Sequence, residues 1–447
     1  MEQTNPKAQK NNLMPEQKPV DKMQHALALH DAAQHKINKL RHIKPFLIDL
    51  SLRENPVGDR VGQTLDEKLA ILPKMREFGF DNILLGTLDY SYPDELEVDD
   101  DFMIYLRDHQ ISMAGGFVFT AIGISQAPGM FTPDPSMIKM QSYTVPNTLH
   151  EIYLSKAGMA GQYDIETLRR SVVASIDWLN ANIVGENGGK PRILINIVDG
   201  CDAFAEDPVT ACEMIALLAA QDIEGISIED DRGTYMPFQV GAFVEMIRTF
   251  MPAPKKLLVH MHAGGGFENA SALEALLSGA DGVWGALPKS AAIIGHASLG
   301  ELIANLVRTG NQHMAESYEL AQLIPLATSL QVQDQEQRVP DDYPILGNNA
   351  YRLPLTFFKQ IEGRFMDLVP EAIGGTYRYR VCPVVSDTKV IAGRLAEVSG
   401  RRPEEFSQTT LENMIRLMRR DLRKGIRIIY DEPENLLKLY VRATTMD

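Results

Sequence analysis

The sequence predicts an α/β protein whose main part is a (β/α)8 TIM barrel, followed by a C-terminal α/β accessory region. Short β-rich runs recur after residue 43, and amphipathic helical segments separate most of them, as parallel strands require. Helix caps stand where they are expected, with Thr64 or Asp66 at one helix start and Gly79 and Gly279 just past helix ends. Eight strand–helix units over roughly 260 residues match such a barrel.

The expected strands are residues 44–52, 82–89, 111–120, 139–145, 192–199, 225–230, 256–262 and 281–287. An open doubly wound sheet is the alternative arrangement of the same elements. No G-x-G-x-x-G follows the first strand and no G-x-x-x-x-G-K-[ST] occurs, so neither nucleotide-binding fingerprint supports that alternative. The barrel is therefore the preferred fold.

The chain divides into three predicted parts. Residues 1–42 form an N-terminal tail and helix, in which the helix covers about residues 20–41 and packs against the barrel. Residues 43–310 form the barrel. Residues 311–447 form the accessory region, with a strand in "YRYRVCPVV" and a helix in "LENMIRLMRRDLRKG".

Composition limits the classes of partner. The net charge of −15 and the lack of an obvious Lys/Arg cluster make nucleic acid an unexpected partner. The three cysteines are scattered, so we expect neither a disulfide framework nor a thiolate zinc site. No leader-like or membrane-spanning apolar stretch is visible, and a cytoplasmic protein without membrane contact is expected.

Polar residues at strand ends carry the predicted chemistry, because active sites of such barrels lie at the carboxyl ends of the strands. Two-residue alternation places Asp49 and Arg53 on one face of the first strand, with Glu54 entering the loop. The same alternation points His260 and His262 to one side of the seventh strand. A carboxylate and two imidazoles at the rim make a three-ligand metal site, although a chance H-x-H and a surface Arg–Glu pair are the plain alternatives.

Several segments, in order along the chain, resemble one enzyme family. "IDLSLRE" with "TLDEKLAIL" looks like its first strand and helix, and "IEDDRGTYMP" looks like its sixth-strand turn. "HMHAGGGFENASALEALLSGADGV" and "IIGHASLGELI" resemble its last barrel segments. On these motifs the chain resembles the DRE-TIM metallolyase superfamily, which includes 2-isopropylmalate synthase, homocitrate synthase, HMG-CoA lyase and the pyruvate carboxylase carboxyltransferase domain.

The C-terminal part resembles the synthases of this family. "ILGNNAYRLPLTFF" and "YRYRVCPVVSDTKVIAGRLAEVSG" stand where the synthases carry their accessory segments, so the resemblance covers about residues 43–430. It implies a divalent-metal-dependent acyltransferase that condenses an acyl-CoA, such as acetyl-CoA, with a 2-oxo acid. It also implies a homodimer.

The resemblance assigns metal ligands and a charge-stabilising residue. Glu54, His260 and His262 are implied to hold a divalent metal, which is Mg, Mn, Zn or Fe(II). His296, in the place of the family's asparagine, either adds a ligand or fills space. Arg53 is implied to stabilise the developing enolate or alkoxide.

Further assignments concern substrate binding and proton transfer. Asp49 and Gly266 match positions that bind substrate, and Asp230 matches the aspartate of the sixth strand. Asp231 replaces the catalytic threonine beside it and carries over only a polar role. We therefore expect both aspartates in the catalytic machinery.

The sequence departs from the synthases at the expected general base. Leu353 and Phe358 stand where the synthases carry histidines, and His150, Tyr351 and Asp199 are possible replacements. Because these histidines are absent, a metal-dependent C–C lyase of the same superfamily is the first alternative. A non-catalytic 2-oxo acid binding regulator is the second.

Overall fold

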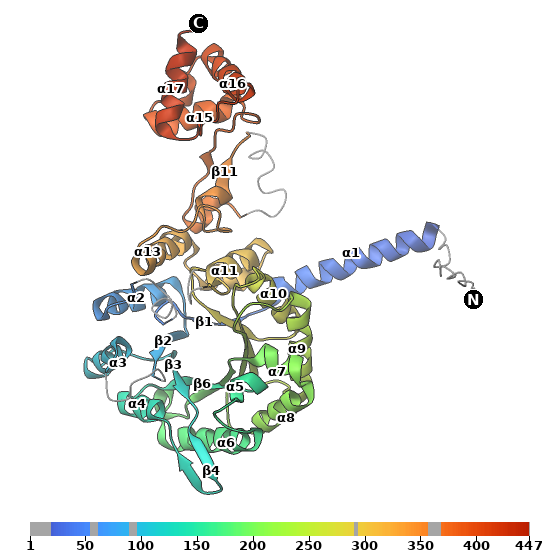
Figure 1. Ribbon diagram of the computed structural model, residues 1–447, viewed down its shortest axis with the longest axis vertical. Helices are drawn as coiled ribbons and strands as arrows, with labels where there is room; N and C mark the ends of the chain where they lie inside the picture. Colours follow the sequence, from blue (N-terminus) through green and yellow to red (C-terminus); the bar gives the residue numbers. More distant parts are fainter. Residues whose placement is uncertain (1–18, 54–60, 89–95, 290–293, 356–367, 447) are drawn as a thin grey trace, which may run out of the picture.

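The computed structural model describes residues 19–53, 61–88, 96–289, 294–355 and 368–446. Its centre is a closed barrel of eight parallel strands in the order β1-β10-β9-β8-β7-β6-β3-β2, which confirms the (β/α)8 fold (Figure 1). The barrel strands are β1 (Phe46–Asp49), β2 (Ile83–Thr87), β3 (Gly116–Ala121), β6 (Asn147–Ile152), β7 (Arg192–Ile197), β8 (Gly225–Asp230), β9 (Lys256–Met261) and β10 (Gly282–Gly285). A hairpin of β4 (Ile124–Ala127) and β5 (Met130–Thr132), which the sequence did not suggest, follows β3.

Helices surround the barrel, and the start of α2 and the ends of α2 and α10 lie at the predicted caps. The surrounding helices are α2 (Leu65–Phe78), α3 (Val98–Asp108), α4 (Pro135–Tyr143), α5 (Lys156–Met159), α6 (Ile165–Asn182), α7 (Gly200–Glu206), α8 (Pro208–Ala219), α9 (Pro237–Phe250), α10 (Glu268–Ser278) and α11 (Leu299–Arg308). Thr64 caps α2 through a capping box with Glu67, and Gly79 and Gly279 end α2 and α10.

One predicted strand is wrong. Residues 139–145 were expected to form a β-strand, but most of them belong to α4. The barrel strand is β6, which follows this helix. Asp134 caps the helix and Pro135 occupies its first position, a start signal that outweighs the β-branched residues at the end of the run. The buried positions of α4 then recur at helical spacing, at Ser136, Met137, Met140 and Tyr143.

Two apolar layers hold the barrel together. The inner layer fills the barrel and consists of Ile48, Leu50, Leu84, Phe117, Phe119, Leu149, Leu194, Leu258, Trp284 and Ala286. The outer layer lies between strands and helices, and includes Ile195, Ile228 and Val259 from the same strands. Strand residues that belong to the inner layer point into the barrel. Because side chains alternate along a strand, the residues two and four positions further toward the carboxyl end also point inward.

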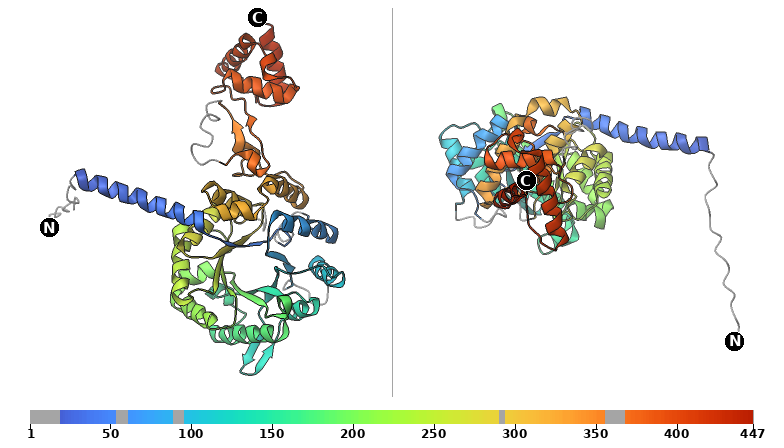
Figure 2. Two further views of the ribbon diagram at one scale, coloured as in Figure 1. Left: turned by 180° about the vertical axis from the view of Figure 1, so that it is seen from behind. Right: turned by 90° about the horizontal axis from the view of Figure 1, so that it is seen from above.

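The N-terminal helix α1 (Pro19–His42) leaves the barrel and extends away from it (Figures 1 and 2). Only its last turns contact the barrel helices: Lys39 Nζ donates to Leu277 O at 2.6 Å and Arg41 Nε donates to Thr309 O at 2.7 Å. Met23 and Leu27 are 63% and 55% exposed. The expected helix is present, but it packs against the barrel only through its carboxyl end.

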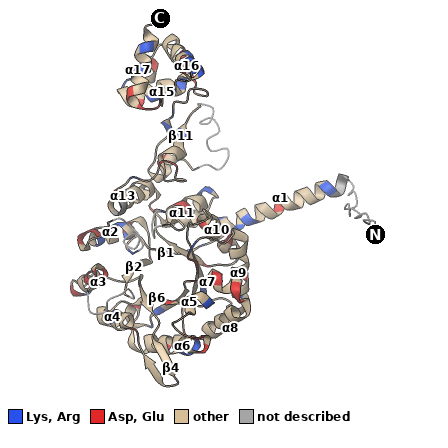
Figure 3. Cartoon of the chain, viewed as in Figure 1, with Lys and Arg blue, Asp and Glu red and all other residues tan. Residues whose placement is uncertain are grey.

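The C-terminal region is mainly helical. It contains α12 (Gln312–Ser317), α13 (Leu323–Gln335), the two-residue strands β11 (Arg352–Leu353) and β12 (Arg378–Tyr379), and the helices α15 (Thr388–Ser399), α16 (Gln408–Arg423) and α17 (Pro433–Thr444). The last three helices share a core of their own, built on residues such as Leu395, Met414 and Leu436. Basic side chains gather on α16 (Figure 3), and Arg420 and Arg423 lie in its last turn.

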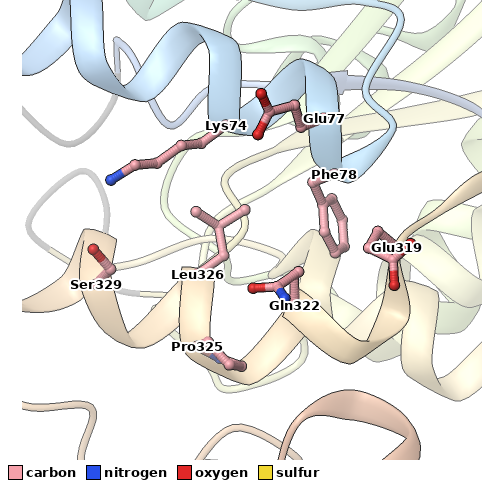
Figure 4. A pocket seen from close by; sticks show the side chains of 8 residues that line it. All are labelled: Lys74, Glu77, Phe78, Glu319, Gln322, Pro325, Leu326 and Ser329. Carbon is pink, nitrogen blue, oxygen red and sulfur yellow. The ribbon is translucent and has the colours of Figure 1, made fainter.

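A groove of about 490 Å³ lies where α13 meets α2 (Figure 4). Lys74 and Glu319 lie at opposite ends of it, with Phe78 and Leu326 between them. None of the residues that line it belongs to a barrel strand, so this groove is separate from the strand ends. Within the described ranges, no helix is both long enough and apolar enough to cross a membrane.

Candidate metal centre at the barrel mouth

Three neighbouring strands turn polar side chains inward just above the inner apolar layer. Leu194 and Leu258 belong to that layer, so Asn196 on β7 and His260 on β9, two residues further along, also point inward. Glu229 on β8 is paired in register with His260. The apolar floor and the polar mouth thus follow from a single alternation pattern.

Glu229, His260 and His262 form a compact group. Each offers one ligand atom, and these atoms lie within 4.8 Å of one another. His262 Nε2 is 3.9 Å from Glu229 Oε2, and Glu229 and His260 are buried. One carboxylate and two imidazoles with open positions opposite them are a ligand set typical of catalytic Zn, Fe(II) and related divalent ions.

Contacts around His260 fix its ring for metal binding. Its Nδ1 lies 2.8 Å from Trp284 O, and because a carbonyl only accepts, Nδ1 carries the proton and Nε2 keeps its lone pair. The ring stacks on the Trp284 indole with centroids 3.6 Å apart. The indole is held in turn, since its Nε1 donates to Ser227 Oγ at 2.6 Å.

The protonation states fit a metal site. Burial lowers the pKa of His262 to about 4, with the positive charge of Arg53 as the second cause, and burial lowers that of His260 well below its usual value. Both imidazoles are therefore neutral at pH 7, as metal binding requires. Burial raises the pKa of Glu229 to about 8 although Asn196 donates a hydrogen bond to it. A cation bound between these groups would favour the ionised form of Glu229 and so offset the energetic cost of burying its negative charge.

Arg53 brings a positive charge to the same place. Its Nε donates to Thr87 Oγ1 at 2.7 Å, and its guanidinium lies 4.2 Å from the centre of the Phe119 ring. Phe119 belongs to the inner layer, so the guanidinium covers the barrel floor at the mouth. Its positive charge contributes, after burial, to lowering the pKa values of His260, His262 and His296.

His296 joins the group from the segment after β10. Its backbone forms an isolated bridge with His262, and its ring centroid lies 4.8 Å from that of His260. Nδ1 lies 3.4 Å from Ala297 O, while Nε2 is buried and has no hydrogen-bond partner among the described residues. Burial lowers its pKa to about 3. A buried, unpartnered imidazole nitrogen beside the triad fits either a further ligand or a contact to a bound molecule.

Glu54 falls outside the described residues. Other predicted residues have different surroundings from the histidines. Asp230 accepts hydrogen bonds from the backbone of Thr234 at 3.1 Å and Tyr235 at 2.9 Å, so its carboxylate stabilises the turn after β8. Asp231 is half-buried beside it, and burial raises its pKa. Gly266 lies in the turn before α10 with φ 75°, where its backbone N–H donates to Ala263 O at 3.0 Å.

The possible general bases are also dispersed. His150 is buried on the outward side of β6, where it contacts Thr120 Oγ1 at 2.8 Å. Asp199 accepts from the backbone of Leu154 and Ser155 at 2.7 and 2.9 Å. Leu353 is buried in the C-terminal region, which also contains Tyr351, and Phe358 lies outside the described residues.

Asp49 points away from the barrel interior. Its neighbours Ile48 and Leu50 belong to the inner layer, and its carboxylate accepts from Ser51 N at 2.9 Å and Ser51 Oγ at 3.0 Å. Burial raises its pKa to about 7. The structure therefore separates Asp49 from the histidines, although the first-strand pattern grouped it with Arg53. Arg53 reaches the mouth because the strand ends at Asp49 and a turn follows.

Replacing Asp49 with asparagine is expected to flatten the pH dependence of stability. The folded-state pKa of about 7 exceeds the reference value of 3.8, so Asp49 favours folding below pH 4, and this contribution disappears as pH rises through 7. The difference amounts to about 4 kcal/mol between pH 4 and pH 8. Melting temperatures measured across this range should fall more steeply in the wild type than in Asp49→Asn; equal slopes would contradict the assignment.

Glu229 and Asn196 are the residues that the sequence reasoning missed. The signal was present, because the alternation that pairs His260 with His262 also pairs Ser227 with Glu229 in "GISIED". The family-like motif directed attention to Asp230, the next residue. Trp284 supports His260 through its carbonyl and its ring.

Comparisons with known proteins concern the fold. No protein-family model matches the sequence, and no curated protein is significantly similar to it. An HMG-CoA lyase from Acinetobacter baumannii, solved with coenzyme A and 3-methylmalate, matches with a TM-score of 0.52 at 14% identity, over 67% of this chain and 93% of that one. The Bacillus subtilis HMG-CoA lyase also gives 0.52 at 14% identity, over 71% of this chain and 98% of that one. The barrel of this chain is thus similar in fold to the HMG-CoA lyases, which belong to the superfamily that its sequence motifs resemble.

Proposed function

We propose that this protein is a divalent-metal-dependent enzyme that forms or breaks a carbon–carbon bond next to a carbonyl group, and a divergent member of the DRE-TIM metallolyase superfamily. The observation that carries the proposal is the buried group of Glu229, His260 and His262 with Arg53 beside it. The group lies at the carboxyl ends of the strands, where barrel enzymes bind their substrates. The donor set suits Mg, Mn, Zn or Fe(II).

The residues of this chain have distinct tasks. Glu229, His260 and His262 hold the ion, which when bound supplies Lewis acidity toward the oxygens of a 2-oxo acid. The Trp284 carbonyl keeps the His260 ring in the tautomer that can bind, and Asn196 orients Glu229. His296 and Glu54 remain proposed additional ligands.

Arg53 stabilises the negative charge that develops on the substrate. Enolate and alkoxide oxygens gain charge during both carbon–carbon bond formation and cleavage, and a fixed guanidinium in a buried site lowers the energy of that state. Thr87 and Phe119 hold Arg53 in place before substrate arrives. Asp231, half-buried directly after β8, keeps a polar role in the proposal, whereas the contacts of Asp230 stabilise a turn.

The specific reaction proposed is condensation of an acyl-CoA, with acetyl-CoA as the first candidate, with a 2-oxo acid in a homodimer. The C-terminal region that follows the barrel, including α15 to α17, supports a synthase-like chain rather than a bare barrel. A lyase reaction is the second candidate. The buried, apolar Leu353 favours it, because this side chain cannot deprotonate an acyl-CoA methyl group.

Removing divalent metal with a chelator is expected to abolish the reaction, and adding back one of the four candidate ions is expected to restore it. The assay follows release of free CoA from acetyl-CoA with glyoxylate, pyruvate, 2-oxoisovalerate or 2-oxoglutarate. Formation of acetyl-CoA or a 2-oxo acid from the condensed products tests the lyase direction. Turnover that persists in the chelated protein would overturn the proposal, and metal and 2-oxo acid binding without turnover in either direction would indicate a regulator.

A further inference from the structure

A second cluster of polar side chains, two of them buried and two half-buried, lies beside the mouth, between the first turns of α10 and α11. It contains Glu268, Asn269, Lys289 and Glu301. Glu268 and Glu301 are each only 4% exposed. Lys289 Nζ forms an ion pair with Glu268 Oε1, and Asn269 Nδ2 donates to Glu301 Oε2 at 2.6 Å. None of these side chains takes part in the triad.

Three oxygens of this cluster have no partner. Glu268 Oε2, Asn269 Oδ1 and Glu301 Oε1 are buried and accept no hydrogen bond from the described part of the chain. Buried oxygens of this kind are ordinarily paired with a donor, a water or a cation. Each belongs to a different side chain, and contacts connect Asn269 to Glu301 and Glu268 to Lys289.

The charges of the cluster do not balance. Two buried carboxylates face one half-buried ammonium group, which leaves the cluster with a net charge of −1. Tyr343 also lies within electrostatic range of Glu268, Lys289 and Glu301 and adds no positive charge. Oxygen-only ligands suit hard cations rather than ions that favour imidazole or thiolate.

We propose that Glu268, Asn269 and Glu301 bind a single alkali-metal cation, K⁺ or Na⁺, with Lys289 supplying the rest of the charge balance. A monovalent ion brings the cluster to neutrality, whereas a divalent ion leaves an excess of +1. The site is joined to the candidate metal centre, because the Lys289 carbonyl accepts a hydrogen bond from His296 N at 3.2 Å. Binding of the cation therefore stabilises the backbone that carries His296.

The test compares the melting temperature in KCl, NaCl and N-methylglucamine chloride at equal ionic strength. At pH 8 the wild type is expected to melt at least about 2 °C higher in KCl or NaCl than in the organic salt. Glu301→Gln should lose the difference. Glu274→Gln, a matched change on α10 whose carboxylate pairs with Lys36, should keep it. His260→Ala should also keep it, which separates this site from the proposed metal centre.

A second measurement needs no variant. Crystals of the wild type soaked in a thallium(I) salt should show an anomalous peak between Glu268, Asn269 and Glu301. Equal melting temperatures in the three salts at pH 8, together with no thallium peak, would overturn the proposal. A shift with millimolar MgCl2 or CaCl2 but not with the alkali chlorides would overturn the monovalent assignment.

Discussion

Replacing Glu229 with glutamine is expected to weaken divalent-metal binding by more than about 100-fold. Loss of a residue that merely orients a ligand costs 10- to 100-fold, and Glu229 is itself a ligand in the proposed site. Glutamine keeps the size of the side chain and can still accept the hydrogen bond from Asn196, so the fold should be retained. Affinity is measured by competition with a chromophoric chelator, and bound metal by elemental analysis.

Two controls sharpen this experiment. Asp49→Asn changes a buried carboxylate on the outward side of the barrel and should leave metal affinity unchanged. Glu54→Gln changes the carboxylate that the sequence resemblance selected. If Glu54→Gln loses the metal while Glu229→Gln retains it, the carboxylate ligand is the one implied by the resemblance, and the triad read from the structure is wrong.

The barrel could be predicted because its signals are local and repeated. Strand runs, helix caps such as Thr64 and the alternation that ends in His260 each depend on a few neighbouring residues. The prediction failed at residues 139–145, where β-branched residues end a segment whose beginning carries a helix start. The C-terminal region was harder, because the core of α15 to α17 joins residues far apart in sequence.

The site was predictable in part for the same reason. His260 and His262 are two residues apart at the end of β9, so their common direction can be read from alternation. Glu229 comes from the next strand, and only the register between β8 and β9 places it opposite His260. Likewise, the support that Trp284 gives to His260 depends on the barrel closing, which no local pattern specifies.

Replacing Arg53 with methionine is expected to lower kcat/KM of the proposed reaction by about 10²- to 10³-fold, the range found when a fixed donor to a developing oxyanion is removed. Methionine keeps an apolar side chain over Phe119, so the loss should reflect the missing charge rather than a collapsed floor. Metal content should stay at the wild-type level, because Arg53 carries no ligand atom. Steady-state CoA release and elemental analysis measure the two quantities.

Arg192 provides a matched control at the other end of the barrel. Its guanidinium lies 5.0 Å from the centre of the Phe46 ring and 5.1 Å from that of Phe117, near the amino-terminal ends of the strands. Arg192→Met removes the same group from a similar aromatic setting, so any general cost of losing an arginine–ring contact appears in both variants. Arg53→Lys should recover part of the rate, because it restores the charge without the planar fork. Only if Arg53→Met is much slower than Arg192→Met does the charge at the mouth act on the reaction; equal rates would assign Arg53 to packing alone.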